Sequence, residues 1–440
     1  MDFARDDFAL KLVAALLAFA ATFLAVRVLD SSSEPPELGS AGAGARAGAL
    51  PTASTAERIE ALQAQVADAP TDPRGRTALG AAYLTRIGET EDPGLYDEAE
   101  RSFNTALSLA PNDFEATAGL AELELSRHHF RRGLALALRA REINPSVARV
   151  DGAIVDGQIE LGRYAAAERR LARYANRQPE VASYSRISYY RELLGDPVGA
   201  LSAMGLAASA AGGNSKQADF AQTLIGRLLF ERGDYARAER IWRGVLARSP
   251  GAPDAMLGLA AVQAGRGDLN SAVERHRAVF ESIPAPDHAV LLGEALEAAG
   301  DQEGAAAAYR EAASAFERLG AAGVNTSTEL AVFEADHGSA GRAVEAGRRA
   351  WRLTPSVRAA DAYSWALSAA GRERAALRFS REAMRLGSFD PLFLYHAGIV
   401  SKRSGDEDRA RRLLGELLGQ SRRFSPRFGP RAEAAFQALR

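Results

Sequence analysis

The histidines and one short acidic cluster are the residues of this sequence best suited to acid–base or metal chemistry. The six histidines stand at positions 128, 129, 276, 288, 337 and 396. Glu334, Asp336 and His337 lie near the end of an expected helix, and general acid–base catalysis uses these side-chain types. His128 and His129 are adjacent, but they fall in an expected turn, which favours a solvated turn over a metal site.

No motif completes a catalytic, cofactor or metal site. The sequence contains neither a Gly-rich phosphate loop nor a His-Glu-x-x-His motif. It also contains no cysteine, which excludes thiolate nucleophiles, thiolate metal sites and disulfides. Polar residues at a helix end explain Glu334, Asp336 and His337 better than catalysis does. We therefore expect no enzyme activity, no cofactor and no metal; an enzyme using this cluster is the alternative.

The composition is that of an Ala- and Leu-rich helical protein with nearly balanced charge. Hydrophobic residues make up 47% of the chain, aromatic residues only 7%, and the formal net charge is −2. Nucleic-acid binding needs a basic surface, so nucleic acid is not expected as a partner. No small-molecule substrate is indicated either. Protein or peptide partners are the class that remains.

Glycines recur with a period near 34 residues along most of the chain. The intervals between successive members are 33, 38, 34, 33, 38, 33 and 34 residues. The series comprises Gly162, Gly195, Gly233, Gly267, Gly300, Gly338, Gly371 and Gly405, and His128 and Gly94 continue it toward the N-terminus. A fixed period of this length is typical of stacked helical repeats.

Each period predicts two helices joined by a tight turn at the glycine. A small residue such as Ala238 follows the glycine by five positions, and a larger one such as Trp242 follows four positions later. These spacings place the residues on one helical face. A proline such as Pro250 then ends the second helix, because proline lacks the N–H group and clashes with the preceding turn.

The first repeat carries the clearest signature. Its residues are Leu79, Gly80, Tyr83, Ala99, Phe103, Ala106 and Pro111. With this pattern the chain resembles the tetratricopeptide repeat family over about residues 71–426, or about ten repeats. The resemblance implies an all-α solenoid coiled as a right-handed superhelix. The other copies are looser, with Gly347 and Ser380 in place of the bulky residue of the second helix.

The N-terminal segment differs in kind from the repeats. Residues 8–26 are apolar except for Lys11, and nineteen such residues can span a bilayer core. We expect a transmembrane signal anchor within residues 1–30; a peptide cleaved near Ala18-Phe19-Ala20 is the alternative. Arg5 and Lys11 precede the span and only Arg27 follows closely, which favours a cytoplasmic N-terminus. Both alternatives place the repeats outside the cytoplasm.

A flexible linker is expected between the membrane segment and the repeats. Residues 31–54 are rich in Ser, Pro, Gly and Ala and cannot bury much apolar area. The solenoid then occupies residues 55–440. Thr55 is expected to cap a short helix with Ile59, Leu62 and Val66 at helical spacing, which would cover the first repeat.

The resemblance also implies a binding groove. In tetratricopeptide proteins the first helices of successive repeats line a concave surface that holds peptides or partner helices. On that basis inward positions of the last two repeats are Asp361, Trp365, Tyr395, His396 and Lys402, and a second set is Arg186, Tyr189 and Arg227. Trp365 would suit a binding hot spot; packing of Trp365 and Tyr395 between repeats is the alternative.

Repeats without a catalytic set indicate a scaffold. We expect a non-catalytic, membrane-tethered protein that recruits protein or peptide partners outside the cytoplasm. A regulatory or accessory subunit of an envelope-associated enzyme or secretion complex is the alternative. The chain is similar in layout to membrane-anchored bacterial tetratricopeptide proteins that regulate envelope synthesis, although it lacks their C-terminal cysteine knuckle.

Overall fold

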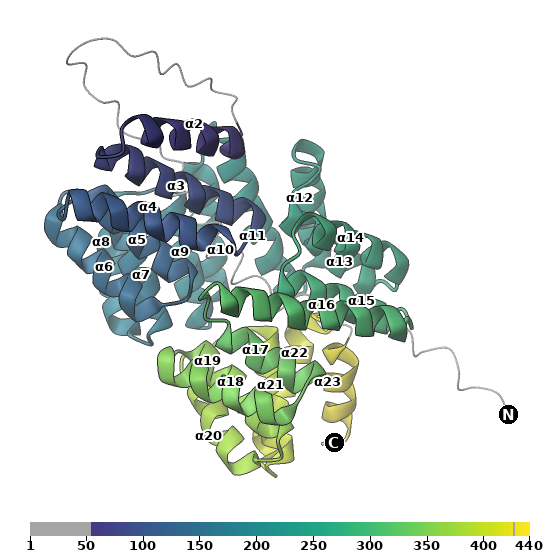
Figure 1. Cartoon of the computed structure of the whole chain (residues 1–440). Coiled ribbons are helices and arrows are strands. Elements are labelled where there is room, and N and C mark those ends of the chain that lie inside the picture. The colour runs from purple at the N-terminus through teal and green to yellow at the C-terminus, as the bar shows by residue number, and fades with distance from the viewer. Residues whose placement is uncertain (1–53, 426) are drawn as a thin grey trace.

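The computed structural model describes residues 54–425 and 427–440, where all regular structure is helical (Figure 1). Helices α3 to α22 form ten antiparallel pairs, so the expected all-α solenoid is confirmed. The first helices of the pairs are α3 (Pro73–Thr90), α5 (Phe114–Ser126), α7 (Val150–Glu160), α9 (Val181–Leu193), α11 (Ser215–Glu231), α13 (Pro253–Gly265), α15 (Pro286–Ala298), α17 (Ser327–His337), α19 (Val357–Ala369) and α21 (Pro391–Arg403).

The second helix of each pair returns along its partner. These helices are α4 (Leu95–Leu109), α6 (Phe130–Ile143), α8 (Tyr164–Arg177), α10 (Pro197–Ala210), α12 (Tyr235–Arg248), α14 (Leu269–Ser282), α16 (Gln302–Ala321), α18 (Ala340–Leu353), α20 (Glu373–Ala383) and α22 (Glu407–Ser421). Single helices, α2 (Thr55–Asp68) and α23 (Phe428–Gln437), flank the array.

The expected membrane segment, residues 1–30, lies outside the described residues, as does nearly all of the expected linker. In the part of the chain that the structure describes, no helix has both the length and the apolar character that a bilayer crossing requires.

Helix α2 covers the first repeat, but its cap is one residue earlier than expected. Ser54, not Thr55, is the N-cap: its hydroxyl accepts the Glu57 backbone N–H, and the Glu57 carboxylate accepts the Ser54 N–H. This capping box satisfies two otherwise unpaired donors. The sequence contains both Ser54 and Thr55, and only the position of Glu57 three residues after Ser54 distinguishes them. Ile59 and Val66 are buried against α3.

The periodic glycines mark turns that require a left-handed backbone. Seven of them have φ between 68° and 87°: Gly162, Gly195, Gly233, Gly267, Gly300, Gly371 and Gly405. Glycine adopts this conformation without the Cβ clash that other residues incur. His128 takes the place of glycine with φ 57°. Gly94 and Gly338 have negative φ, so their turns are built differently.

Glycines within the first helices have a separate role, which is to receive the bulky residue of a second helix. The Phe103 ring lies between Gly80 of its own repeat and Gly119 of the next. Trp242 lies in the same way between Gly226 and Gly258. A Cβ added at any of these four glycines would fall under 3.0 Å from the ring. Close helix approach therefore depends on glycine here.

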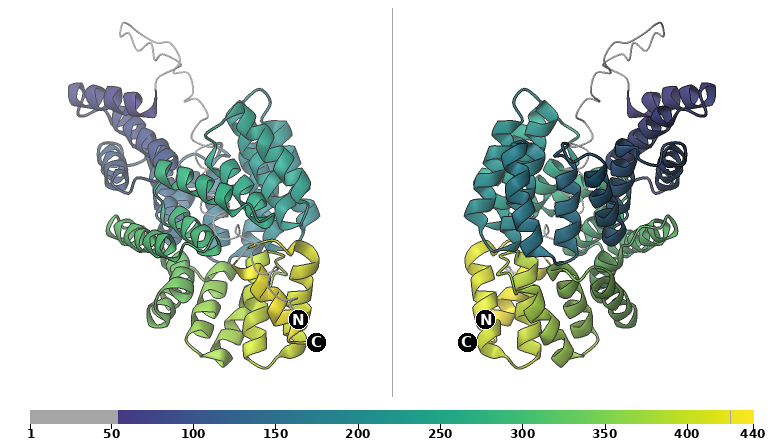
Figure 2. Two further views of the ribbon diagram at one scale, coloured as in Figure 1. Left: turned by 90° about the vertical axis from the view of Figure 1, so that its right-hand side faces the viewer. Right: turned by 90° about the vertical axis from the view of Figure 1, so that its left-hand side faces the viewer.

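The solenoid coils tightly enough that its second turn touches its first. Figure 2 shows the C-terminal helices directly beneath the teal helices near α11, and α11 contacts α22. Hydrogen bonds join Asn325 N to Arg127 O (2.9 Å), Val357 N to the Tyr164 hydroxyl (2.8 Å), Gln420 Nε2 to Glu231 O (3.1 Å) and Arg423 N to the Tyr235 hydroxyl (3.0 Å). We call this line of contact the seam.

The seam sets the number of repeats in one superhelical turn. The partners in three of its bonds are 188 to 193 residues apart. At a period near 34 residues this separation is between five and six repeats. The glycine turns themselves take part: a Cβ at Gly162, Gly195 or Gly233 would come under 3.0 Å from the carbonyl oxygen of Pro355, Gly387 or Gln420.

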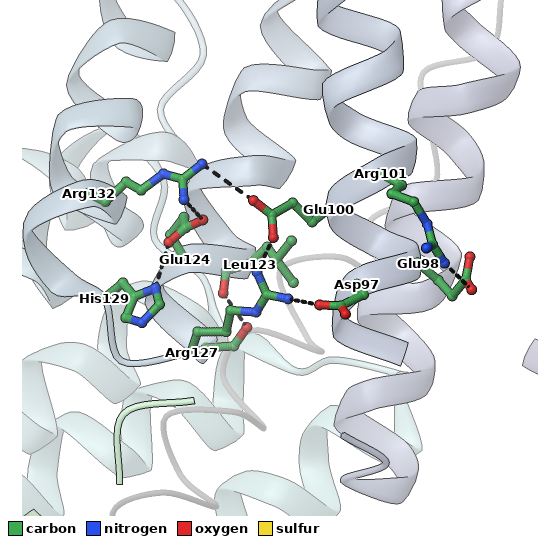
Figure 3. A network of polar contacts seen from close by, with 10 residues as sticks. Asp97, Glu98, Glu100, Arg101, Leu123, Glu124, Arg127, His129 and Arg132 are labelled. Atoms are coloured by element: carbon green, nitrogen blue, oxygen red, sulfur yellow. Dashed lines mark hydrogen bonds and ion pairs between the residues drawn. The ribbon is translucent and has the colours of Figure 1, made fainter. Parts of the chain in front are cut away.

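A buried arginine holds the first seam contact in place (Figure 3). The Arg127 guanidinium bridges Asp97 and Glu100 of α4, and its side chain is 5% exposed. Burial raises the pKa of Glu100, but the hydrogen bond and charge of Arg127, helped by Arg132, bring that pKa below its usual range. The α5–α6 turn that accepts the Asn325 N–H is thus fixed to the preceding repeat.

Candidate functional site

A partly open pocket lies against the first helices of the last four repeats, and we call it the inner chamber. Helices α15, α17, α19 and α21 supply most of its wall, and Ser425 and Phe428 close it at the C-terminal end. Its apolar lining consists of Val290, Leu291, Phe316, Val332, Phe333, Ala362, Leu392, Phe393 and Phe428. A concave, mostly apolar space with a few convergent polar groups is the usual form of a ligand site.

Carboxylates dominate the polar part of the chamber. They belong to Asp287, Glu294, Glu329, Asp336, Asp361 and Asp390. The basic side chains in the lining are those of Arg358 and His337. Asp287 shows the consequence: burial, followed by the charges of Glu329 and Glu91, raises the pKa of its carboxyl to about 7. The charge of Arg358 counteracts only part of this rise in the pKa of Asp287.

Acidic groups of the first superhelical turn face the same interior. Burial raises the pKa of Glu91, just after α3, to about 7, and Asp254 of α13 adds to the rise. Burial also raises the pKa of Glu160 in α7 to about 7, against the opposing charge of Arg358. Glu91 keeps part of its surface accessible while protein surrounds it on most sides, as expected for the wall of an enclosed interior.

An arginine from the C-terminal segment contacts two of the acidic residues of the chamber. Arg427 donates to the Asp336 backbone carbonyl (2.9 Å) and lies 3.5 Å from Glu294. The His337 ring stacks on Tyr309 at 3.8 Å between centroids, and its Nε2 lies 3.5 Å from the Glu294 carboxylate. Burial lowers the pKa of Arg427, but the charges of Asp336 and Glu294 outweigh it and raise that pKa.

Of the residues expected in the C-terminal groove, Asp361 lines the chamber. Asp361 accepts a hydrogen bond from the buried His396 ring at 2.8 Å, and His396 stacks on Trp365 at 4.2 Å. The Trp365 indole donates to Asp336 at 3.1 Å, and Tyr395 lies against Phe428 at 4.8 Å. Trp365 and Tyr395 are thus packed between repeats, the arrangement weighed as the alternative. Their role in binding stays a prediction.

The remaining expected groove residues are engaged within the protein. Lys402 lies 3.4 Å from the Ala435 carbonyl of α23. Arg227 bridges Glu192 and Glu231 at 2.8 Å, and Tyr189 donates to Glu160 at 3.3 Å. Arg186 is 4% exposed and binds Asp156 through two hydrogen bonds. The contacts of the described residues do not test whether these side chains bind a partner, so their place in a binding groove also stays a prediction.

The cluster considered for catalysis is divided by the fold. Asp336 and His337 line the chamber, whereas Glu334 accepts the Ser339 backbone N–H (2.8 Å) and pairs with Arg342 outside it. His128 and His129 also contact different partners: the His128 ring contacts Asn325 O at the seam, and the His129 ring contacts the Glu124 carboxylate. Across residues 54–425 and 427–440, no group of three His, Asp or Glu side chains is placed to hold a metal ion.

Comparison with known proteins supports the repeat family for the middle of the array. The sequence model of the tetratricopeptide repeat matches residues 229–289, from the end of α11 to the start of α15. This segment is therefore similar to the tetratricopeptide repeat. No curated protein sequence matches the chain.

Three solved structures are among those in which the chain follows a similar course. A tetratricopeptide repeat protein from Parabacteroides merdae has 18% identity, covers 55% of this chain and 98% of its own, and gives a TM-score of 0.40. Cut9–Hcn1, an APC/C hetero-tetramer, has 11% identity, coverage of 88% and 93%, and a TM-score of 0.37. YrrB, described as having an unusual peptide-binding site, has 18% identity, coverage of 45% and 97%, and a TM-score of 0.29.

Most of the acidic residues of the inner chamber were not predicted from the sequence. Asp287, Glu329 and Asp390 lie at or near the N-terminal ends of first helices, where carboxylates commonly stabilise helix termini. Pro253-Asp254, Pro286-Asp287 and Asp390-Pro391 recur at these ends. This recurrence could have indicated the acidic site, because the first helices of these repeats converge and bring their N-terminal carboxylates to one interior.

The crowded carboxylates predict a pH dependence of stability. The pKa values of Glu91, Glu160, Glu231 and Asp287 are raised to about 7. The folded protein therefore binds more protons than the unfolded chain between these pH values. The contribution of these carboxyls to the free energy of unfolding is fully present below pH ~4 and is lost as the pH rises toward 7. A shift from 4.5 to about 7 at buried Glu160 corresponds to roughly 3 kcal/mol. Thermal unfolding from pH 5 to 8 should show a falling midpoint.

A variant separates this effect from other titrations. Burial lowers the pKa of His276 to about 3, so this histidine destabilises the folded protein as the pH falls below its ordinary pKa. Its effect is opposite in sign to that of the carboxyls. The measured quantity is therefore the difference between the parent and Glu160→Gln, with the exposed Glu407→Gln as control. Glu160→Gln should flatten the pH profile between 5 and 8. A profile as steep as that of the parent would contradict the raised pKa.

Proposed function

We propose that this chain is a non-catalytic interaction scaffold whose tetratricopeptide repeats hold protein or peptide partners in the inner chamber. The observation that carries the proposal is the chamber itself, a mostly apolar pocket formed by first helices of successive repeats. Its walls belong to helices held by neighbours on both sides, so the site is built on a rigid frame. We further propose that residues 1–30 tether the array to a membrane and that it lies outside the cytoplasm.

Site-specific photo-crosslinking in cells tests the interaction. A photoreactive amino acid replaces Thr328 in the chamber or, as a control, the exposed Glu303 on α16. We expect Thr328 to form crosslinks with a restricted set of proteins and Glu303 to form none of the same products. A single enzyme among those products would favour the accessory-subunit alternative. Identical products at both positions would argue against the chamber as the binding site.

The tether is tested separately. Intact cells and right-side-out membrane vesicles are treated with protease, and the array is followed by an antibody. The proposal expects the full-length protein in the membrane fraction and an array that the protease reaches from outside. An array protected in intact cells but cut after lysis would place it in the cytoplasm and overturn this part.

A further inference from the structure

The inner chamber carries more negative charge than its own basic groups offset. Six carboxylates line it, and Arg358 and His337 are the basic side chains of the lining. Arg427 lies behind them, in contact with Glu294 and Asp336. Like charges in a partly buried, low-dielectric space repel one another, and either a bound proton or a compensating cation reduces that cost.

Two carboxylates in the chamber also have acceptor atoms that no hydrogen bond satisfies. The Glu294 side chain is 6% exposed, and its Oε1 is buried without a hydrogen-bond donor; the Arg427 guanidinium and the His337 Nε2 atom are each 3.5 Å away. The Glu329 Oε2 is likewise buried without a donor. Buried polar atoms are usually hydrogen-bonded, so unsatisfied acceptors that line a cavity indicate a missing donor.

The space beside these carboxylates is apolar. Phe316, Val332, Phe333, Leu392 and Phe393 contribute to its wall, and each is buried or half-buried among neighbouring repeats. A small hydrated cation would leave this wall in contact with water. A purely apolar ligand would remove water from the carboxylates without replacing their hydrogen bonds, which is unfavourable. The lining suits a ligand that carries both an apolar body and a donor cation.

We propose that the inner chamber binds a segment of a partner protein in which arginine or lysine alternates with large apolar side chains. This inference rests on the proposed function and names the ligand class of the same site. A guanidinium can give two parallel hydrogen bonds to a carboxylate and satisfy its acceptors. The neighbouring apolar side chain fills the space bounded by Phe333 and Phe393. Asp287, Glu294 and Glu329 select the cation, and the aromatic wall selects its neighbours.

Fluorescence anisotropy with defined peptides tests the ligand class on the full-length chain. The first probe is a labelled peptide of sequence Gly-Leu-Arg-Phe-Arg-Leu-Gly with blocked ends. The second has Glu in place of both Arg residues, and the third has Ser in place of Leu and Phe. We expect binding of the first probe only, weakening as ionic strength rises, because exposed parts of the attraction are screened by salt.

A charge-matched pair of variants locates the binding. Asp287→Asn/Glu329→Gln removes two chamber carboxylates, and Glu407→Gln/Asp408→Asn removes two exposed carboxylates from α22. The chamber variant relieves repulsion, so it should fold at least as well as the parent, which circular dichroism checks. We expect the chamber variant to bind the first probe at least about tenfold more weakly and the surface variant to bind it unchanged.

The outcomes separate this inference from the proposed function. Equal binding of the Glu-substituted or Ser-substituted peptide would overturn the ligand class, as would equal losses in both double variants. Absence of peptide binding while Thr328 still crosslinks to proteins in cells would overturn the ligand class and leave the scaffold function standing. Absence of both peptide binding and crosslinks would overturn both the ligand class and the proposed scaffold function.

Discussion

Gly195→Ala should destabilise the protein by about 2–5 kcal/mol. Gly195 has φ 69°, where an alanine costs roughly 1–2 kcal/mol. The added Cβ would also come under 3.0 Å from the Gly387 carbonyl oxygen across the seam, which is backbone and cannot rotate away. Overpacking of this kind costs about 1–3 kcal/mol more. The thermal midpoint and amide hydrogen exchange around residues 386–390 would report the loss.

Gly371→Ala is the matched control. Gly371 has nearly the same φ, 68°, and nothing lies within 4 Å of an added Cβ. It should therefore lose only the backbone contribution, roughly 1–2 kcal/mol, with no change of exchange near residue 387. If both variants lost the same stability and exchanged alike, the contact between superhelical turns would not exist in solution.

Asp156→Ala should cost about 3–5 kcal/mol, because it removes a buried carboxylate that accepts two hydrogen bonds from a buried guanidinium. Asp156 and Arg186 are 5% and 4% exposed, and their two hydrogen bonds measure 3.0 and 2.9 Å. Replacing both residues, Asp156→Leu with Arg186→Met, should recover most of the loss, since an apolar pair of similar size needs no compensation. Chemical unfolding followed by circular dichroism measures each variant.

An exposed ion pair provides the reference for this prediction. Glu98 and Arg101 pair on α4 with side chains 45% and 67% exposed. Glu98→Ala should change the free energy of unfolding by less than about 1 kcal/mol. A loss as small for Asp156→Ala would mean that Arg186 is not held by Asp156, and it would restore Arg186 as a candidate for partner contact.

The repeat architecture was predictable because its signals are local. Each repeat contains its own pattern: a glycine at a left-handed turn, an alanine five residues later and then a bulky residue. Gly233, Ala238 and Trp242 are one example. Even the boundary of α2 was one residue away from its expected place. Neighbouring units dominate the packing of such arrays, so the sequence of each unit largely decides its shape.

The site was less predictable because it depends on contacts between distant repeats. Trp365 suggested a binding hot spot because it is unusual in an Ala-rich helix. In the structure its side chain is buried and stacks on the His396 ring, and its role in binding stays a prediction. Glu91 and Asp287 are nearly 200 positions apart, and nothing in either local sequence indicates that one raises the pKa of the other. Their proximity follows from superhelical pitch, which arises from small rotations added over several repeats.

Gain or loss of a unit would affect this protein differently from an open repeat array. In an open array each unit meets only its neighbours, so the count of units can drift without harm to the others. Here Tyr164 meets Val357 and Tyr235 meets Arg423 across the same interval of between five and six repeats. Deleting one internal repeat would move every such pairing out of register at once. The number of repeats between the paired turns is therefore fixed by the geometry of contacts between superhelical turns, and not only by contacts between neighbouring repeats.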